Sequence, residues 1–316
     1  MLNRRDLVKT GGLAVGALTL GGLSAKSAGA QSTPPPVQSI PIAANGFIFD
    51  AITCGPESGE LVLHLHGFPE FKECWMPVIQ ALGAQGYYAV AVDQRGYSPK
   101  ARPTNAQDYV IANLVSDVVG FGAALKGTGT RFHLIAHDQG ASVGWAFAAA
   151  HPELLLSTTL LSSPHVNAFV AAYTQPGNPQ QAASSYIPQL QTNGVAFMTQ
   201  NNNANFYGSY AGVVPDATTF VNQFTVTDPG SLQAAINWYV VENFTVANEP
   251  VITTPVTYVW GALDPFLLKG VAVNTANFVT GPYTFIQLPN IGHFIADQVP
   301  QDVVTIFLQQ VQAKLT

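Results

Sequence analysis

The sequence has 316 residues, of which 47% are hydrophobic and only 9% are charged, so it can bury one large core. Its formal net charge at pH 7 is −6, and no basic stripe follows the first residues, which gives no reason to expect a nucleic-acid partner. The low content of charged residues is typical of an exported protein.

Residues 1–30 contain the three parts of an export signal. The pair Arg4-Arg5 is a twin-arginine arrangement, residues 11–23 are mildly apolar and rich in glycine, and the signal ends in Ala-Gly-Ala, a cleavage site of the A-x-A type. The apolar run is too short for a stable membrane span, and the alternative is an uncleaved amphipathic helix. We expect a bacterial precursor carried by the twin-arginine export machinery, and a mature protein that is periplasmic or secreted.

The mature chain predicts alternating strands and helices. Residues 31–38 contain three consecutive prolines and predict an extended linker, and Asn45-Gly46 predicts the turn of a hairpin. Alternation of strands with helices predicts an α/β fold with a parallel sheet. The expected strands are residues 40–43, 47–53, 61–65, 87–92, 132–136, 155–161, 256–260 and 284–288, and the expected helices include residues 73–82, 108–125 and 301–315.

Residues 164–249 differ in character from the rest of the chain. They are rich in Gln, Asn, Ala and Tyr, with pieces of helical length and no strong strand. An insertion late in a parallel sheet predicts a helical lid over a core formed by residues 39–163 and 250–316. The chain has two cysteines, Cys54 and Cys74, which we expect at opposite ends of the sheet and therefore free, with a disulfide as the alternative.

The stretch from Phe132 to Trp145 predicts a reactive residue at a sharp turn. A buried strand leads into Ala136-His137-Asp138-Gln139-Gly140, and a helix follows. Small residues two before and two after Asp138 are the layout of a nucleophile elbow, in which larger side chains would collide across the turn. A carboxylate at its centre would form a covalent ester. The alternative is that Asp138 only caps the following helix.

An ester on Asp138 needs a base that activates water, an acid that holds the base, and donors for the oxyanion. His293 and Asp264 each follow one of the last two predicted strands, where ligands bind in open α/β sheets. If each residue is considered alone, the alternative for His293 is a loop or core histidine, and the alternative for Asp264 is a turn residue before proline. The backbone N–H groups of Phe68 and Gln139 are the expected oxyanion donors, because His-Gly-Phe-Pro fixes an unusual turn.

These motifs resemble the epoxide hydrolase branch of the α/β-hydrolase superfamily, over about residues 40–315. The resemblance is carried by HGFPE, DQRGYS, the elbow with Asp138, WGALDPF and NIGHF. It implies the α/β-hydrolase fold, with a mostly parallel eight-stranded sheet, flanking helices and an inserted helical lid. It also implies that the enzyme opens epoxides to diols, with an apolar small molecule and water as its partners and no metal or cofactor.

In that family two lid tyrosines donate hydrogen bonds to the epoxide oxygen. The stretch Ala-Ile-Asn-Trp-Tyr is similar to one tyrosine segment and places Tyr239, and Ser-Ser-Tyr-Ile resembles the other and places Tyr186. An acidic O–H near the breaking bond would stabilise the departing alkoxide. The alternative is that either tyrosine only packs in the lid or lies on the surface.

The sequence departs from the family in two places that bear on the substrate. Gln139 stands where Trp is common, and Val-Val-Glu follows Tyr239 where a basic residue is common. Dehalogenases that share the Asp nucleophile are the nearest alternative. Haloalkane enzymes place Trp after the nucleophile and a side-chain N–H donor after His-Gly, where Gln139 and Phe68 stand here. Fluoroacetate enzymes clamp a carboxylate with arginines, and the neutral Gln139 and Ser142 occupy those positions.

Two further alternatives differ in class. A non-catalytic binding protein could use the same fold, but it would have no need to retain Asp138, Asp264 and His293 together. A serine-type esterase is excluded because no serine occupies the centre of the elbow.

Overall fold

The computed structural model describes residues 35–246 and 249–313, so the predicted export signal and residues 31–34 of the predicted linker lie outside the described residues. Eight strands form one sheet in the order β1-β2-β4-β3-β5-β6-β7-β8. Neighbours from β4 to β8 are parallel, whereas β1 and β2 run antiparallel, which confirms the predicted sheet. The strands are β1 (Gln38–Ala44), β2 (Phe47–Cys54), β3 (Leu61–Leu65), β4 (Tyr88–Val92), β5 (Phe132–His137), β6 (Leu155–Leu161), β7 (Val256–Gly261) and β8 (Tyr283–Leu288).

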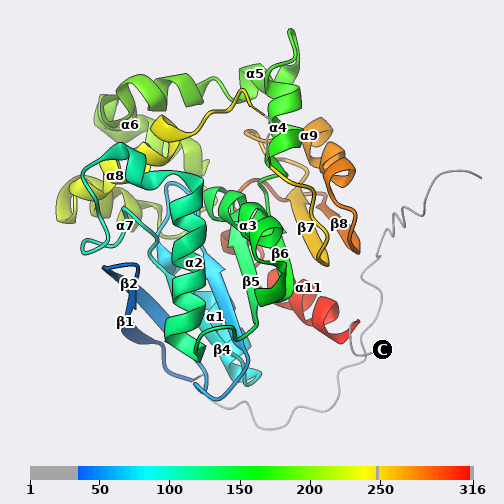
Figure 1. The fold of residues 1–316 in the computed structure, drawn as a ribbon. Coiled ribbons are helices and arrows are strands. Elements are labelled where there is room, and N and C mark those ends of the chain that lie inside the picture. The colour runs from blue at the N-terminus through cyan, green and yellow to red at the C-terminus, as the bar shows by residue number, and fades with distance from the viewer. Residues whose placement is uncertain (1–34, 247–248, 314–316) are drawn as a thin grey trace, which may run out of the picture.

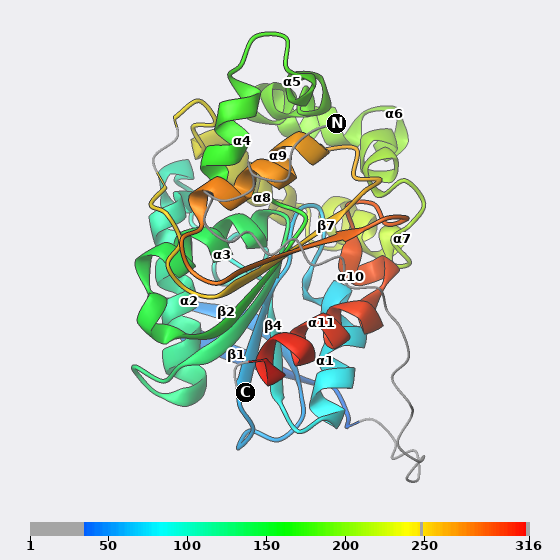
Figure 2. The same ribbon diagram turned by 90° about the vertical axis from the view of Figure 1, so that its right-hand side faces the viewer.

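Helices cover both faces of the sheet. Figures 1 and 2 show α2 (Ile111–Lys126) and α3 (Gln139–Ala150) on one face, and α1 (Met76–Ala84) and α11 (Pro300–Gln312) on the other. Every residue of β3, β4 and β5 is consequently buried, which is why these strands are almost wholly apolar in sequence.

The boundaries of several elements differ from the prediction for local reasons. The hairpin turn is as predicted, because Asn45 and Gly46 both have positive φ, of 50° and 80°. The helix expected over residues 108–125 is wrong at its start: Val110 is extended, with φ −60° and ψ 149°, and separates the short 3-10 turn η2 (Ala106–Tyr109) from α2. A second 3-10 turn, η1 (Lys72–Trp75), likewise precedes α1, and α10 (Ile295–Gln298) precedes α11.

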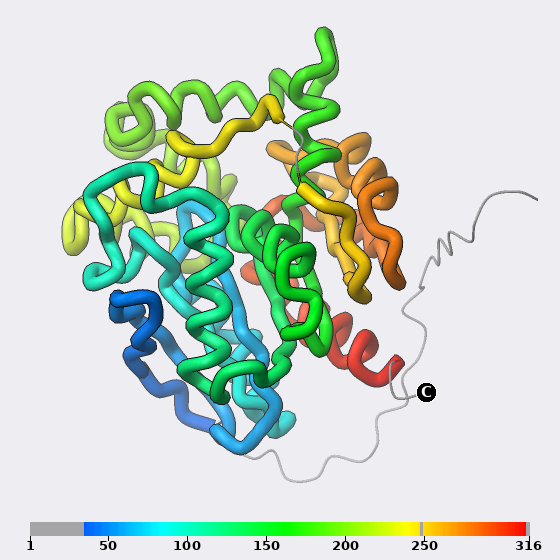
Figure 3. The backbone as a smooth tube through the Cα atoms, viewed as in Figure 1, coloured from blue at the N-terminus to red at the C-terminus, as the bar shows by residue number. Residues whose placement is uncertain are grey.

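The segment between β6 and β7 is helical and stands over one end of the sheet (Figures 1 and 2). Figure 3 shows the chain leaving the sheet after β6, running through these helices and returning to β7. We call them the insertion helices: α4 (Val166–Tyr173), α5 (Pro179–Ala183), α6 (Tyr186–Tyr210), α7 (Ala217–Asn222), the π-turn η4 (Gln223–Thr227) and α8 (Gly230–Val241).

Both cysteines are free and buried, as expected. Cys54 ends β2, and Cys74 lies in η1 near the start of α1. Within the described ranges, no helix has the length and apolar character that a membrane crossing requires.

Candidate active site

Asp138 stands between β5 and α3 in a backbone conformation that few residues other than glycine adopt, with φ 50° and ψ −121°. A Cβ atom on Gly140 would lie 2.5 Å from the carbonyl oxygens of Leu65 and His66, and one on Gly67 would lie 2.3 Å from the Cβ of Asp138. Glycine is therefore required two residues after Asp138 and also at the point where the loop after β3 approaches Asp138. The Asp138 side chain makes no capping hydrogen bond to α3, so the capping interpretation is wrong.

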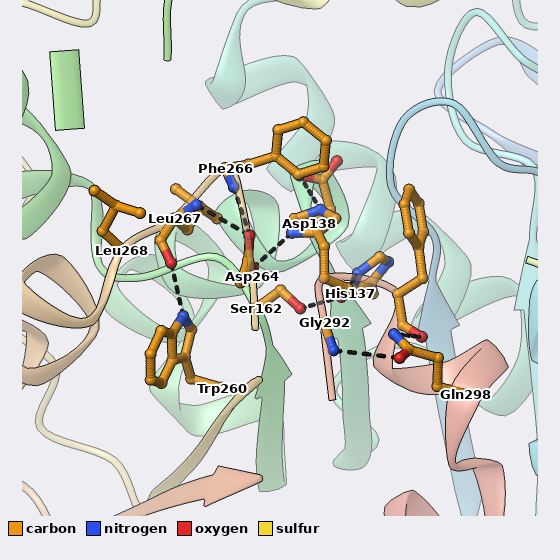
Figure 4. Close-up of polar contacts among 12 residues, drawn as sticks. His137, Asp138, Ser162, Trp260, Asp264, Phe266, Leu267, Leu268, Gly292 and Gln298 are labelled. Atoms are coloured by element: carbon orange, nitrogen blue, oxygen red, sulfur yellow. Dashed lines mark hydrogen bonds and ion pairs between the residues drawn. The ribbon is translucent and has the colours of Figure 1, made fainter. Parts of the chain in front are cut away.

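The three residues predicted to act together meet in the structure. His293 lies between two carboxylates, with Nδ1 2.8 Å from Oδ2 of Asp264 and Nε2 3.3 Å from Oδ2 of Asp138. The other oxygen of Asp264 accepts backbone N–H groups from Phe266 at 2.8 Å and Leu267 at 3.0 Å, as Figure 4 shows. Each oxygen of Asp264 is thus held, which fixes the orientation of the His293 ring.

The charges of this arrangement stabilise one another. Burial disfavours the charged form of His293, but the carboxylates of Asp264 and Asp138 outweigh it and raise the pKa of His293 to about 10. Burial also disfavours the charged form of Asp138, and its contact with His293 outweighs that effect and lowers the pKa of Asp138. At neutral pH the site therefore holds an imidazolium between two carboxylates.

One of the two predicted oxyanion donors contacts the carboxylate of Asp138, and the other follows Asp138 in the chain. The backbone N–H of Phe68 donates to Oδ1 of Asp138 at 2.9 Å, from the loop after β3. Gln139 is the first residue of α3, where a backbone N–H has no partner within the helix. The positive end of α3 is thus next to Asp138.

Tyr239 on α8 and Tyr186 at the start of α6 face each other near Asp138, with 6.3 Å between their ring centroids. Both line the cavities that Asp138 lines. Burial, followed by nearby groups including Asp138, raises the pKa of each phenol well above its ordinary value, so both stay protonated at neutral pH. Neither hydroxyl has a hydrogen-bond partner among residues 35–246 and 249–313.

Two cavities meet at Asp138, Tyr186 and Tyr239. One has a volume of about 230 Å³ and contains His293, and the other has a volume of about 90 Å³ and contains Gln139. A larger cavity of about 1000 Å³ lies against α9 (Lys269–Asn274) and β8, and none of the three residues of the triad lines it. The residues predicted to act together therefore line the two smaller cavities. In the described part of the chain, no group of three or more His, Cys, Asp or Glu side chains could hold a metal ion.

The sequence pattern of the alpha/beta hydrolase fold matches residues 60–299. The chain belongs to this family. This α/β-hydrolase is 28% identical to epoxide hydrolase 2 of Caenorhabditis elegans over 271 residues, which cover 81% of this chain and 74% of the relative. It is 25% identical to epoxide hydrolase A of Mycobacterium tuberculosis over 311 residues, which cover 84% of this chain and 94% of the relative.

Solved structures give the same assignment. The crystal structure of Bacillus megaterium epoxide hydrolase in complex with an inhibitor is similar to this chain at a TM-score of 0.75 and 26% identity, over 86% of this chain and 100% of the other. The α/β-hydrolase is therefore an enzyme with relatives among epoxide hydrolases.

Three further residues hold His293 of this α/β-hydrolase in place, and sequence reasoning did not assign them that role. The carbonyl oxygen of His293 accepts hydrogen bonds from Oγ of Ser162 at 2.5 Å and from Nε2 of His137 at 2.9 Å (Figure 4). On its other side, Nδ1 of His137 lies 3.1 Å from Oε2 of Glu70.

The protonation of this chain of contacts follows from its burial. Burial lowers the pKa of His137 to about 4 and raises the pKa of Glu70 to about 7. A neutral His137 that donates through Nε2 must accept at Nδ1, so the proton between them is on Glu70 below about pH 7. Glu70 and His137 stand inside the HGFPE and elbow motifs, but a sequence cannot show that they meet.

Proposed function

We propose that this α/β-hydrolase opens epoxides to vicinal diols through an alkyl ester on Asp138. The observation that carries the proposal is a pair of phenol hydroxyls beside an ionised carboxylate. These hydroxyls, of Tyr186 and Tyr239, have no hydrogen-bond partner among the residues that the structure describes. A carboxylate can attack a carbon, and the two hydroxyls can receive the oxygen that departs from that carbon.

In the first step, Oδ2 of Asp138 attacks an epoxide carbon while Phe68 holds Oδ1. The C–O bond of the ring breaks and its electron pair goes to the epoxide oxygen, which remains attached to the neighbouring carbon as an alkoxide. Tyr239 and Tyr186 hydrogen-bond this oxygen as its charge develops. The alkoxide takes up one proton and the imidazolium of His293 loses one, so the ring of His293 is neutral at the end of this step.

In the second step, His293 acts as the base. Alkylation removes the negative charge of Asp138, which is one cause of the high pKa of His293, so the neutral imidazole is stable in the ester state. His293 takes a proton from water, which attacks the carboxyl carbon of Asp138. The oxyanion forms at Oδ1, where the N–H groups of Phe68 and Gln139 stabilise it.

Collapse of this intermediate restores the starting state. The bond between the carboxyl carbon and the alkyl oxygen breaks, and the second proton of the water goes to the departing diol. Asp138 is again a carboxylate and His293 an imidazolium. The two steps balance in atoms and electrons without a metal, an oxidant or a cofactor.

A substrate panel with a matched variant tests the proposal. Wild type and Asp138→Ala are each given a styrene-type oxide, an aliphatic epoxide and the corresponding haloalkanes. We expect diol from the epoxides with wild type only, and no halide release. Halide release without diol would contradict epoxide opening and favour a dehalogenase with the same triad. Circular dichroism is the check that Asp138→Ala is folded.

We also propose that the protein is exported through the twin-arginine pathway and acts in the periplasm or outside the cell. The support is the order of its signal, with Arg4-Arg5, an apolar run and a cleavage site at residue 30. Residues 164–249 are proposed to act as a lid, because their helices supply Tyr186 and Tyr239 to the cavities at Asp138.

A further inference from the structure

The two cavities that meet at Asp138 differ in polarity. The larger one, of about 230 Å³, is lined mainly by apolar side chains, and we call it the apolar cavity; they include Phe68, Leu190, Phe197, Met198, Phe266 and Phe294. The smaller one, of about 90 Å³, carries five further polar side chains besides Asp138 and the aromatic residues of its lining, and we call it the acceptor pocket; they are Gln139, Ser142, Ser163, Glu242 and Glu249. Asp138 lines both of them, together with Tyr186 and Tyr239.

The acceptor pocket holds more hydrogen-bond acceptors than the protein satisfies. Oε1 of Gln139 is buried and accepts no hydrogen bond from any residue that the structure describes. The carboxyl groups of Glu242 and Glu249 have no hydrogen bond or ion pair within the described ranges, and no lysine or arginine lines the pocket. Buried polar groups in folded proteins are nearly always paired, and Oε1 of Gln139 is an exception. The half-buried carboxyls of Glu242 and Glu249 line the same cavity with no cationic side chain among its lining residues, so this excess of acceptors favours a donor from outside the chain.

The electrostatics favour a donor as that partner. Burial, and after it the nearby charge of Glu249, raises the pKa of Glu242 to about 7. Burial also raises the pKa of Glu249. Both carboxyls are half-buried and have no counter-ion within the described ranges, so their charged forms are only partly stabilised by solvent. A ligand N–H or O–H would satisfy them, whereas a ligand that carries only acceptors would be repelled.

We propose that the acceptor pocket binds a hydroxyl or ammonium group on the shorter arm of the substrate, while the apolar cavity takes the longer arm. This inference rests on the proposed epoxide opening. The preferred substrate is then an epoxide with a large apolar group on one carbon and a short donor-bearing group on the other. The volume of 90 Å³ limits that short arm to about three water-sized groups.

Four matched epoxides test the inference on the whole enzyme. Each has a phenyl group on one ring carbon, and the other carbon carries methyl, methoxymethyl, hydroxymethyl or aminomethyl. We expect kcat/KM to be at least about tenfold higher for the hydroxymethyl and aminomethyl compounds, because a site with unpaired acceptors discriminates against analogues that lack the donor. Equal kcat/KM for all four compounds would overturn the inference.

Variants separate the pocket from the intrinsic reactivity of the compounds. Gln139→Leu should reduce the preference for both donor compounds over methoxymethyl. Glu242→Gln keeps an acceptor but removes the charge, so it should reduce the preference for aminomethyl more than that for hydroxymethyl. The matched control is Glu153→Gln, which makes the same change on a side chain that is 63% exposed and should alter neither ratio. A donor preference that survives both pocket variants would contradict the assignment.

The inference and the proposed function fail in different ways. If wild type opens none of the four compounds or a simple styrene oxide, epoxide opening itself is wrong. If it opens all four with no donor preference, epoxide opening stands and only the pocket assignment is wrong. Thermal unfolding midpoints of the variants show whether a lost preference comes from a lost fold.

Discussion

Tyr239→Phe should slow epoxide opening far more than it slows any release of halide. An epoxide oxygen stays attached to carbon and becomes an alkoxide, a strong base that needs a donor as the bond breaks. A chloride or bromide leaves as a weakly basic ion and gains much less from a phenol. Tyr239 has a raised pKa, so its proton is present throughout the ordinary assay range and the loss should not depend on pH there.

The structure limits the effect of this change to the donor. The ring of Tyr239 packs against Phe68 at 5.7 Å and Tyr186 at 6.3 Å between centroids, and phenylalanine retains both contacts. No protein group bonds the hydroxyl in the described part of the chain, so its removal leaves no buried group unpaired. Loss of one positioned transition-state donor costs on the order of 10²-fold in rate, which is about 2.7 kcal/mol.

The assay is steady-state diol formation from styrene oxide, with thermal unfolding as the check of the fold. Tyr186→Phe should give a loss of the same kind, and the double variant should be almost inactive yet unchanged in melting temperature. The matched control is Tyr207→Phe on α6, an exposed tyrosine that lines neither cavity. Epoxide turnover by Tyr239→Phe within about twofold of wild type would refute the reasoning, because Tyr239 would then only pack.

Three other predictions concern stability, pH and export. Gly140→Ala should lower the free energy of unfolding by about 2 kcal/mol in chemical denaturation, because its Cβ would meet backbone oxygens at 2.5 Å, whereas Gly270→Ala, with open space at its Cβ, should not. The ion pairs of His293 should stabilise the fold fully below about pH 6.5, and this contribution should decline as pH rises and be lost above its pKa of about 10. The free energy of unfolding of His293→Gln, measured by chemical denaturation, should lack this dependence on pH. Replacement of Arg4 and Arg5 by lysine should leave folded enzyme in the cytoplasm, and its accumulation in the periplasm would contradict the twin-arginine proposal.

The sheet and the triad could be predicted because each depends on a short local pattern. Buried parallel strands are almost wholly apolar, and Asp138, Asp264 and His293 each follow such a strand. All the carboxyl ends of parallel strands lie on one edge, so the order along the chain was enough to bring these residues together. The prediction of free cysteines succeeded for the same reason, since it followed from strand direction.

Other features depend on packing that no local pattern records. Val110 breaks a helix that the apolar spacing favours, because the chain turns there to enter α2. The contacts of Ser162 and His137 with the carbonyl oxygen of His293 join residues more than 100 positions apart. The acceptor pocket is polar because Glu242, which directly follows α8, and Gln139 line the same cavity. These two residues are the departures from the family pattern, and they are too far apart in the sequence for their connection to be visible there.

The central claim is that Asp138 carries the substrate as an ester, and the mass of His293→Gln after substrate addition tests it most directly. Attack by Asp138 and hydrolysis by His293 use different groups, so this variant should complete the first step and stop before the second. We predict that its intact mass rises by one epoxide molecule and that the label lies on the peptide containing Asp138, while wild type returns to its unmodified mass. Stoichiometric consumption of epoxide with an unmodified protein mass, or a label on any other residue, would contradict the account.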